Sequence, residues 1–208
     1  MAEPTVGIID YGLGNLHSVA GAVRRLGHRP TITADPDALG AAAKLILPGV
    51  GAFGDGMKNL AARGLVEALD ELVRGQGKPI LGICLGSQLF ARRSFEFGEH
   101  GGLGWVDAEV VPIETGSSRL RVPHVGWNDL FQVRESLLFE GVPADALVYY
   151  VHSYHVRCAD PALVIGETDY GGRLTAAYQQ DSIYATQFHP EKSQRHGLSV
   201  LRNFLKKA

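Results

Sequence analysis

The chain has 208 residues, a formal net charge of −2, and a composition of 45% hydrophobic and 20% charged residues. These values are typical of a globular protein with one sizeable core, and near-neutral charge without a basic stripe argues against nucleic acid as its main partner. No apolar run approaches the ~20 residues that span a bilayer, and the N-terminal residues lack a signal pattern, so we expect no membrane association. The two cysteines, Cys84 and Cys158, predict no disulfide framework, although one bridge between them stays open, and a reducing cytoplasm is the expected location.

The N-terminal half alternates short apolar runs with segments of helical periodicity. The apolar runs predict buried strands at residues 5–9, 30–33, 45–47 and 79–81. Apolar residues at helical spacing predict one helix over 16–26, which Gly27 is placed to end, and a second over 57–72. This alternation indicates a mostly parallel sheet covered by helices on both faces.

The C-terminal half has a different pattern, in which strands follow one another between Gly, Asp and Ser turns. The predicted strands span 105–111, 146–151, 162–168, 174–178 and 183–188. We expect a small antiparallel extension before the chain returns to the sheet, and the apolar spacing from Leu198 to Leu205 predicts a closing helix. No repeat, low-complexity tract or linker interrupts the chain, so the prediction is a single α/β domain over residues 1–208.

The most informative motif is Gly82-Ile83-Cys84-Leu85-Gly86-Ser87, which follows the strand at 79–81 and precedes a segment, 88–93, that we expect to be helical. A strand, a sharp turn and a helix place the Cys84 thiol at the apex, as in a nucleophile elbow with cysteine in place of serine. The flanking glycines let strand and helix approach closely around a strained residue. The helix N-terminus favours the thiolate, so Cys84 is the candidate nucleophile, and an inert packed cysteine is the alternative.

A cysteine nucleophile needs a base, and the base needs an acceptor that orients it. Among eight histidines, His189 is the best candidate, because it follows an apolar run at a predicted strand end and Glu191 lies two residues further on. The carboxylate can accept from one ring nitrogen while the other faces the thiolate, and Pro190 stiffens the link. The alternative is an ordinary surface pair, but the shared strand-end context favours a Cys–His–Glu arrangement.

Two glycine-rich turns follow predicted strands. The first, residues 48–54, has glycines at the carboxyl end of a strand, where their backbone N–H groups can point into a site and form an oxyanion hole. We expect this turn at the same sheet edge as Cys84, and a plain turn is the alternative. In residues 10–15, a dinucleotide site is not favoured, because His17 stands where the third glycine of the fingerprint is expected. No group of Cys and His residues has metal-ligand spacing, so we expect neither a metal nor another cofactor.

Together these motifs resemble the class I, triad-type glutamine amidotransferases, a family with a flavodoxin-like fold. Residues 82–88 and His189-Pro190-Glu191 match its two signatures. Within that family, three further stretches, at 10–16, 123–128 and 151–155, are similar to the glutaminase subunits of imidazole glycerol phosphate synthases, and 189–194 agrees with them. The motifs occur in the expected order over nearly the entire chain.

The resemblance implies that Cys84 attacks the side-chain amide of glutamine, while His189 carries protons and Glu191 orients it. The thioester is then hydrolysed to glutamate. The resemblance also implies that the oxyanion hole is formed by the backbone N–H groups of Gly49, Val50, Gly51 and Leu85. The implied substrate-binding residues are Gln88, Glu96, Ser153 and Tyr154, of which Glu96 suits the α-ammonium group of glutamine.

In that family the ammonia passes into a (β/α)8-barrel synthase (cyclase) subunit, the partner in a heterodimer. The products are imidazole glycerol phosphate, for histidine biosynthesis, and aminoimidazole carboxamide ribotide. By this resemblance, a turn at Asn15 and a loop at 123–128 face the partner, with His124, Trp127 and Asn128 in contact with it. Trp127 is the expected anchor of the interface, and a core position is its alternative.

Other functions stay open for the same triad. A glutaminase subunit serving purine or pyridoxal phosphate synthesis would share it without the 123–128 motif. A stand-alone cysteine hydrolase or peptidase of similar fold would act without a partner and ignore glutamine. A silent interaction module is disfavoured by the intact set of Cys84, His189 and Glu191.

Overall fold

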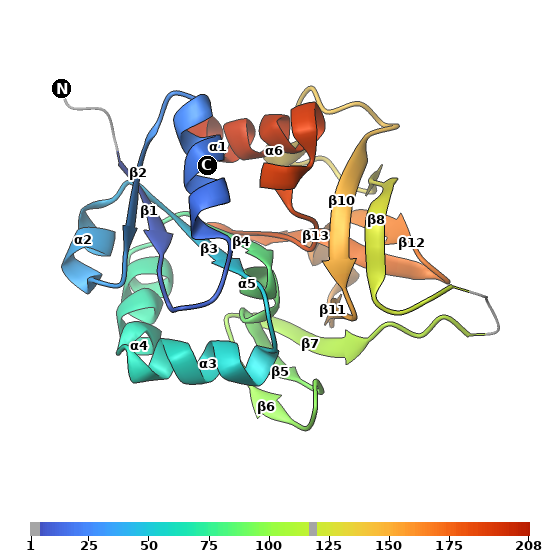
Figure 1. The fold of residues 1–208 in the computed structure, drawn as a ribbon, viewed down its shortest axis with the longest axis horizontal. Helices are drawn as coiled ribbons and strands as arrows, with labels where there is room; N and C mark the ends of the chain where they lie inside the picture. The colour runs from blue at the N-terminus through green and yellow to red at the C-terminus, as the bar shows by residue number, and fades with distance from the viewer. Residues whose placement is uncertain (1–4, 117–119) are drawn as a thin grey trace.

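A mostly parallel sheet forms the centre of the structure, a computed structural model that describes residues 5–116 and 120–208 (Figure 1). Within these residues the main sheet has eight strands. In spatial order they are β2 (Arg29–Thr33), β1 (Thr5–Ile9), β3 (Lys44–Gly49), β4 (Ile80–Cys84), β14 (Ile183–Thr186), β13 (Arg173–Gln180), β12 (Val164–Asp169) and β9 (Phe131–Gln132). The first five run parallel and the last three add antiparallel pairs, which confirms the predicted fold class.

Helices cover both faces of the main sheet, as Figure 1 shows. One face carries α1 (Leu16–Arg25) and α6 (Gln194–Lys207), and the other carries α2 (Pro36–Ala41), α3 (Phe53–Ala62) and α4 (Leu65–Asp70). The apolar spacing of α1 buries Val19 and Val23 against the sheet, and Lys44 of β3 donates to the carbonyls of Phe204 and Leu205 at the end of α6. None of the helices in the described residues is long and apolar enough to cross a membrane.

Two smaller sheets flank the carboxyl ends of the parallel strands. In the described part of the chain, the first is the antiparallel pair of β10 (Leu147–His152) and β8 (His124–Asp129). The second contains β11 (Tyr154–Cys158), β7 (Val106–Pro112), β5 (Ala91–Ser94) and β6 (His100–Gly101). Short 3₁₀ turns complete the path at Leu137–Phe139, Pro161–Leu163 and Pro190–Lys192. The five strands predicted for the C-terminal half are all present, but β5, β6, β8, β9 and β11 were not foreseen.

The single helix predicted over 57–72 is wrong, because this segment contains the end of α3, the whole of α4 and the start of a π-helical turn, Glu71–Gly75. Gly64 separates α3 from α4. Its φ of 64° lies in the left-handed region, which stops the first helix, and its N–H donates to the Ala61 carbonyl at 3.0 Å.

Two further expectations also fail. The helix expected over 88–93 is wrong, because α5 spans only Leu85–Gln88 and the next residues form β5, which pairs with β7. On β5, Arg93 forms ion pairs with Glu99 and Glu109, so tertiary pairing overrides the local helical tendency. The predicted loop at 123–128 is mostly strand β8, which alternates buried and exposed side chains.

The two cysteines are both free thiols in different surroundings. Cys84 is buried at the end of β4, and Cys158 is half-buried at the end of β11. Burial, with Asp160 nearby, raises the pKa of Cys158 to about 12, so this thiol stays protonated and unreactive at neutral pH.

Replacing Gly86 by alanine should destabilise the fold by about 3 kcal/mol or more, because a Cβ at this position would overlap the Leu47 carbonyl oxygen of β3. Gly21→Ala is the matched control. Gly21 lies on the exposed side of α1, a Cβ there would meet nothing in the described structure, and alanine should stabilise by up to ~1 kcal/mol. Urea unfolding measures both, and equal midpoints would show that the β3–α5 contact does not constrain the turn.

Candidate active site

Three neighbouring parallel strands bring the candidate catalytic residues together. In the sheet β4 lies between β3 and β14, with Gly49 opposite Cys84 and Thr186 opposite Ile83. The glycine loop after β3, the thiol at the end of β4 and the His189 segment after β14 therefore emerge at one sheet edge, where ligands bind in parallel sheets.

The backbone at Cys84 has the strained geometry of a nucleophile elbow. Its φ and ψ are 54° and −114°, a region that non-glycine residues rarely occupy. Gly82 permits the turn, since a Cβ there would lie 2.6 Å from the Phe90 ring and 2.7 Å from the Ser87 Cα. The Ser87 hydroxyl donates to the Cys84 carbonyl at 2.6 Å, which ties the turn to α5.

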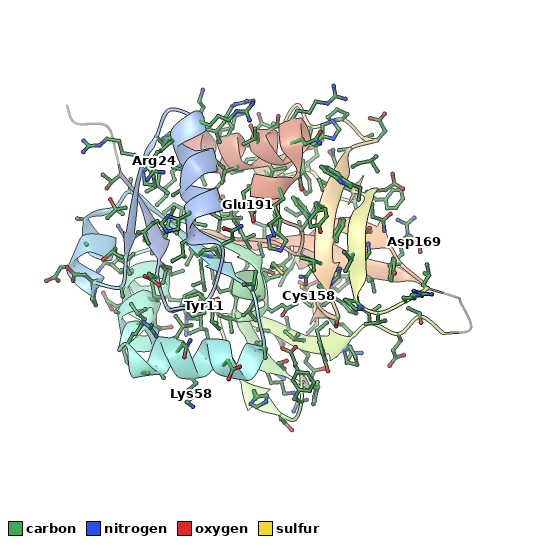
Figure 2. The ribbon with its side chains drawn as sticks, in the orientation of Figure 1. Tyr11, Arg24, Lys58, Cys158, Asp169 and Glu191 are labelled. Carbon is green, nitrogen blue, oxygen red and sulfur yellow. The ribbon has the colours of Figure 1, made fainter. Side chains whose placement is uncertain are left out.

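His189 and Glu191 form a buried pair behind the thiol. The His189 Nδ1 atom lies 2.8 Å from Glu191 Oε1, and the two side chains are only 2% and 1% exposed. Figure 2 shows Glu191 inside the molecule, between α1 and β10. In the described structure, His189 Nε2 has no hydrogen-bond partner. Burial lowers the pKa of His189, but interactions with Cys84 and Glu191 outweigh it and raise that pKa to about 9.

Two groups contact the Cys84 sulfur directly. The Sγ atom lies 3.8 Å from the Val151 carbonyl oxygen of β10, and the Gln187 side chain donates to it from Nε2 at 3.7 Å. The sequence motifs indicated neither residue as a thiol contact. Their contact depends on the packing of β10 and β14 around the end of β4, which no local pattern encodes.

A cavity of about 300 Å³ opens in front of the thiol. Eight residues predicted for the site line it: Val50, Gly51, Cys84, Leu85, Gln88, Glu96, Ser153 and Tyr154. Pro123, Val151 and His152 line it too and were not predicted, whereas Gly49, His189 and Glu191 lie outside the lining. Among residues 5–116 and 120–208, no group of three or more His, Cys, Asp and Glu side chains is placed to hold a metal ion.

Polar side chains on the cavity wall are held in fixed orientations. Gln88 Nε2 donates to the Tyr154 carbonyl and to Gln187 Oε1, both at 3.0 Å, so its own oxygen is left for a ligand. Glu96 Oε2 accepts from the backbone N–H of Phe53, the first residue of α3, at 2.6 Å. The remaining carboxylate oxygen suits a cationic group such as an ammonium.

The candidate oxyanion loop is supported by the first glycine-rich turn. A Cβ on Gly49 would overlap the Tyr11 hydroxyl, and Gly14 lies against the Pro48 carbonyl. Gly51 has a φ of 114°, and Leu85, as the first residue of α5, has an N–H without an intrahelical partner. Tyr11, labelled in Figure 2, is buried, and its hydroxyl makes no hydrogen bond within the described residues.

The four residues expected to face a partner have different surroundings. Trp127 is 46% exposed on β8, and Asn15 is half-exposed directly before α1. Asn128 is half-exposed and donates to the Asp169 carbonyl at 2.9 Å. His124, in contrast, is buried, with its ring stacked between those of Tyr150 and Tyr170. The alternation along β8 turns His124 inward, away from the exposed face that carries Trp127.

The chain is similar to known proteins over almost its entire length. The family model described as glutamine amidotransferase class-I matches residues 7–208. The chain is 48% identical to the imidazole glycerol phosphate synthase subunit HisH of Sulfurimonas denitrificans, with 97% of each chain covered. It is 45% identical to the subunit of the same name from Aquifex aeolicus, covering 97% of this chain and 96% of that one.

Solved structures share the fold at lower identity. One described as a glutamine amidotransferase superposes with a TM-score of 0.75 at 21% identity, covering 97% of both chains. A chain of the PurLQS structure from Thermotoga maritima gives a TM-score of 0.74 at 18% identity, covering 98% of both chains. These structures support the α/β architecture derived above.

Replacing Glu191 by glutamine should lower the pKa of His189 below about 9, because one of the interactions that raise it is lost. NMR titration of the imidazole tests this, with Glu67→Gln on the exposed face of α4 as a control that should leave the titration unchanged.

The same pKa shift has a consequence for stability. Because the folded-state pKa is raised above 6.5, the folded protein holds this proton more tightly, so the stabilisation is complete below pH 6.5 and is lost as pH rises to about 9. In Glu191→Gln this loss should occur at lower pH. An unchanged titration in the variant would contradict the assigned cause of the shift.

Proposed function

This chain belongs to the class I glutamine amidotransferase family, and we propose that it is the glutaminase subunit of imidazole glycerol phosphate synthase, in histidine biosynthesis. It hydrolyses glutamine to glutamate and supplies the ammonia to a synthase subunit. The observation that carries the proposal is the convergence of Cys84 with the buried pair of His189 and Glu191, beside a cavity lined by the residues expected to hold glutamine. We further propose a cytoplasmic location, since a free nucleophilic thiol needs a reducing compartment.

The proposed reaction begins with the Cys84 thiolate and protonated His189, consistent with the pKa of about 9 for this imidazole. The sulfur attacks the side-chain amide carbon of glutamine, and the carbonyl becomes an oxyanion. His189 then gives its proton to the departing nitrogen, and ammonia leaves a thioester. Neutral His189 next takes a proton from water, the hydroxide attacks the thioester, and glutamate is released with the thiolate restored.

Glu191 keeps His189 in the orientation that this sequence requires. Its carboxylate accepts from Nδ1, which directs Nε2 toward the sulfur and stabilises the imidazolium. The oxyanion is stabilised by the N–H of Leu85 and by N–H groups of residues 49–51. Glu96 binds the substrate ammonium and Gln88 accepts from the substrate through its oxygen, while Ser153 and Tyr154 border the carboxylate end.

The ammonia acceptor is a (β/α)8-barrel synthase subunit, and the outer face of the β8–β10 sheet is its docking surface. Opposite residues of an antiparallel pair share a face, which here groups Val125 with Val151 and Trp127 with Tyr149. Val125 is 56% and Trp127 46% exposed, so this face is apolar and open. The Val151 carbonyl of this sheet lies 3.8 Å from Cys84 Sγ, and this short distance supports a docking surface close to the thiol.

Replacing Cys84 by alanine should lower glutamine-dependent synthesis at least ~10³-fold in the complex, because the nucleophile is lost, while added ammonium salts still support the partner's reaction. Cys158→Ala is the matched control and should keep wild-type activity, since that thiol stays protonated and lies outside the cavity lining. Glutamate release measures both. Glutamine-driven turnover by Cys84→Ala would defeat the mechanism.

Replacing Trp127 by alanine should weaken binding to the synthase subunit by about 2 kcal/mol, roughly 30-fold in Kd, because exposed aromatic anchors dominate interface energetics. The control is Val133→Ala, an exposed apolar residue outside the β8–β10 face. Titration calorimetry with the purified partner distinguishes the two variants. Wild-type affinity in Trp127→Ala would place the interface elsewhere.

A further inference from the structure

Three buried polar side chains around the cavity have no role in the mechanism above. His124, His152 and Gln187 are 3%, 6% and 3% exposed. Burying an imidazole or an amide costs free energy unless its polar atoms are hydrogen-bonded. The hydrogen-bond partners of these three side chains therefore indicate their role.

The two histidines join strand β8 to the cavity wall. Asn128 Nδ2 lies 3.3 Å from His124 Nε2, His124 Nδ1 lies 2.9 Å from His152 Nε2, and His152 Nδ1 lies 2.9 Å from the Tyr154 carbonyl oxygen. The carbonyl can only accept, so His152 Nδ1 carries the hydrogen and its Nε2 accepts from His124. His124 Nε2 then accepts from the amide of Asn128, and every donor direction is fixed.

The imidazoles are neutral in this arrangement. Burial lowers the pKa of His124 to about 4 and that of His152 to about 3, so neither is protonated at pH 7. The His124 ring is also clamped, with centroid distances of 4.7 Å to Tyr150 and 4.0 Å to Tyr170. Stacking and hydrogen bonds together hold it in one orientation.

The hydrogen bonds continue from the Tyr154 carbonyl to the nucleophile. This oxygen also accepts from Gln88 Nε2 at 3.0 Å, and Gln88 donates its other hydrogen to Gln187 Oε1 at 3.0 Å. Because Gln187 Oε1 accepts, its amide nitrogen is the group that donates to Cys84 Sγ at 3.7 Å. An unbroken network therefore runs from Asn128 on β8 to the thiol.

We propose that this network is a positioning device, in which Gln187 holds the Cys84 thiolate and His124, through His152 and the Tyr154 carbonyl, sets the orientation of the Gln88 amide. This role rests on the glutaminase function proposed above. An N–H donor favours the charged form of sulfur, so Gln187 acts on the reactivity of the nucleophile. His124 acts on the substrate pocket through His152, which donates to the Tyr154 carbonyl. This carbonyl accepts from the Gln88 amide and so directs the Gln88 oxygen toward the ligand. The two ends of the network should therefore affect different kinetic constants.

The test compares Gln187→Met and His124→Phe in the assembled complex, with kcat and KM for glutamine and the rate of Cys84 alkylation by iodoacetamide. Gln187→Met removes the donor to the sulfur and the acceptor for one hydrogen of the Gln88 amide. It should lower kcat and the alkylation rate about tenfold but leave KM within about twofold, because Gln88 still donates to the Tyr154 carbonyl. His124→Phe keeps the stacked ring but removes both bonds, and should raise KM about tenfold with an unchanged alkylation rate.

Two variants separate this role from simple packing. His124→Asn retains an N–H in place of Nδ1 and should recover most of the loss in KM. Tyr170→Phe keeps the ring on His124 and loses only its hydroxyl bond to the Arg121 carbonyl, so all three measurements should match wild type.

If His124→Phe fails to fold, Asn128→Ala at the half-exposed end should raise KM instead. If Gln187→Met fails to fold, Gln187→Glu replaces it. Glutamate has the shape of glutamine but lacks the N–H donor to the sulfur, so alkylation of Cys84 should be slower.

The proposal is overturned if the variants at the two ends change kcat, KM and alkylation in the same proportion, or if neither changes any of them. Cys84→Ala is measured in parallel. Activity in that variant would refute the glutaminase function itself, whereas equal effects at the two network ends in an otherwise active enzyme would refute only the positioning role.

Discussion

The positive φ angle at Cys84, 54°, is the constraint on which the site depends. Holding a non-glycine residue there costs about 1–3 kcal/mol, and the strain persists only where the surrounding structure excludes a relaxed backbone. Gly86 lies directly against the Leu47 carbonyl of β3, and Gly82 lies against Phe90 and Ser87. Relaxing the turn would break these contacts along the β3–β4–α5 junction, so close packing of backbone on backbone is what keeps the thiol at the edge of the sheet.

The electrostatics of the site follow from that position. Burial opposes protonation of His189, but interactions with Cys84 and Glu191 raise its pKa to about 9, and the Glu191 side chain is itself buried. Desolvation of such charges is costly, and a buried ion pair is weak evidence for stability, so the arrangement is better explained by reactivity than by folding. The cost of burying Glu191 is offset in part by its hydrogen bond with His189 Nδ1 at 2.8 Å, and the segment after β14 holds both residues near the end of β4, the neighbouring strand.

The sequence predicted those parts of the site that depend on local patterns. The strands up to β4 and the turn at Cys84 carry their signals in consecutive apolar residues and glycines, and His189-Pro190-Glu191 follows the apolar run that forms β14. The break at Gly64 and the strand β5 were missed, because a left-handed glycine inside an apolar repeat and pairing with β7 both outweigh helical spacing. Gln187 and His152 were missed because their contacts reach across the fold, and β8 was missed because its buried face carries His124 rather than an apolar side chain.

The alternation along β8 gives one strand two environments. Trp127 and Val125 point outward, while His124 and Asn128 point toward the hydrogen bonds that lead to Gln88 and the thiol. The strand pairs only with β10 in the described structure. The two-residue period of a single strand therefore places the exposed face of the β8–β10 sheet and the hydrogen bonds that lead to the cavity on opposite sides of one backbone.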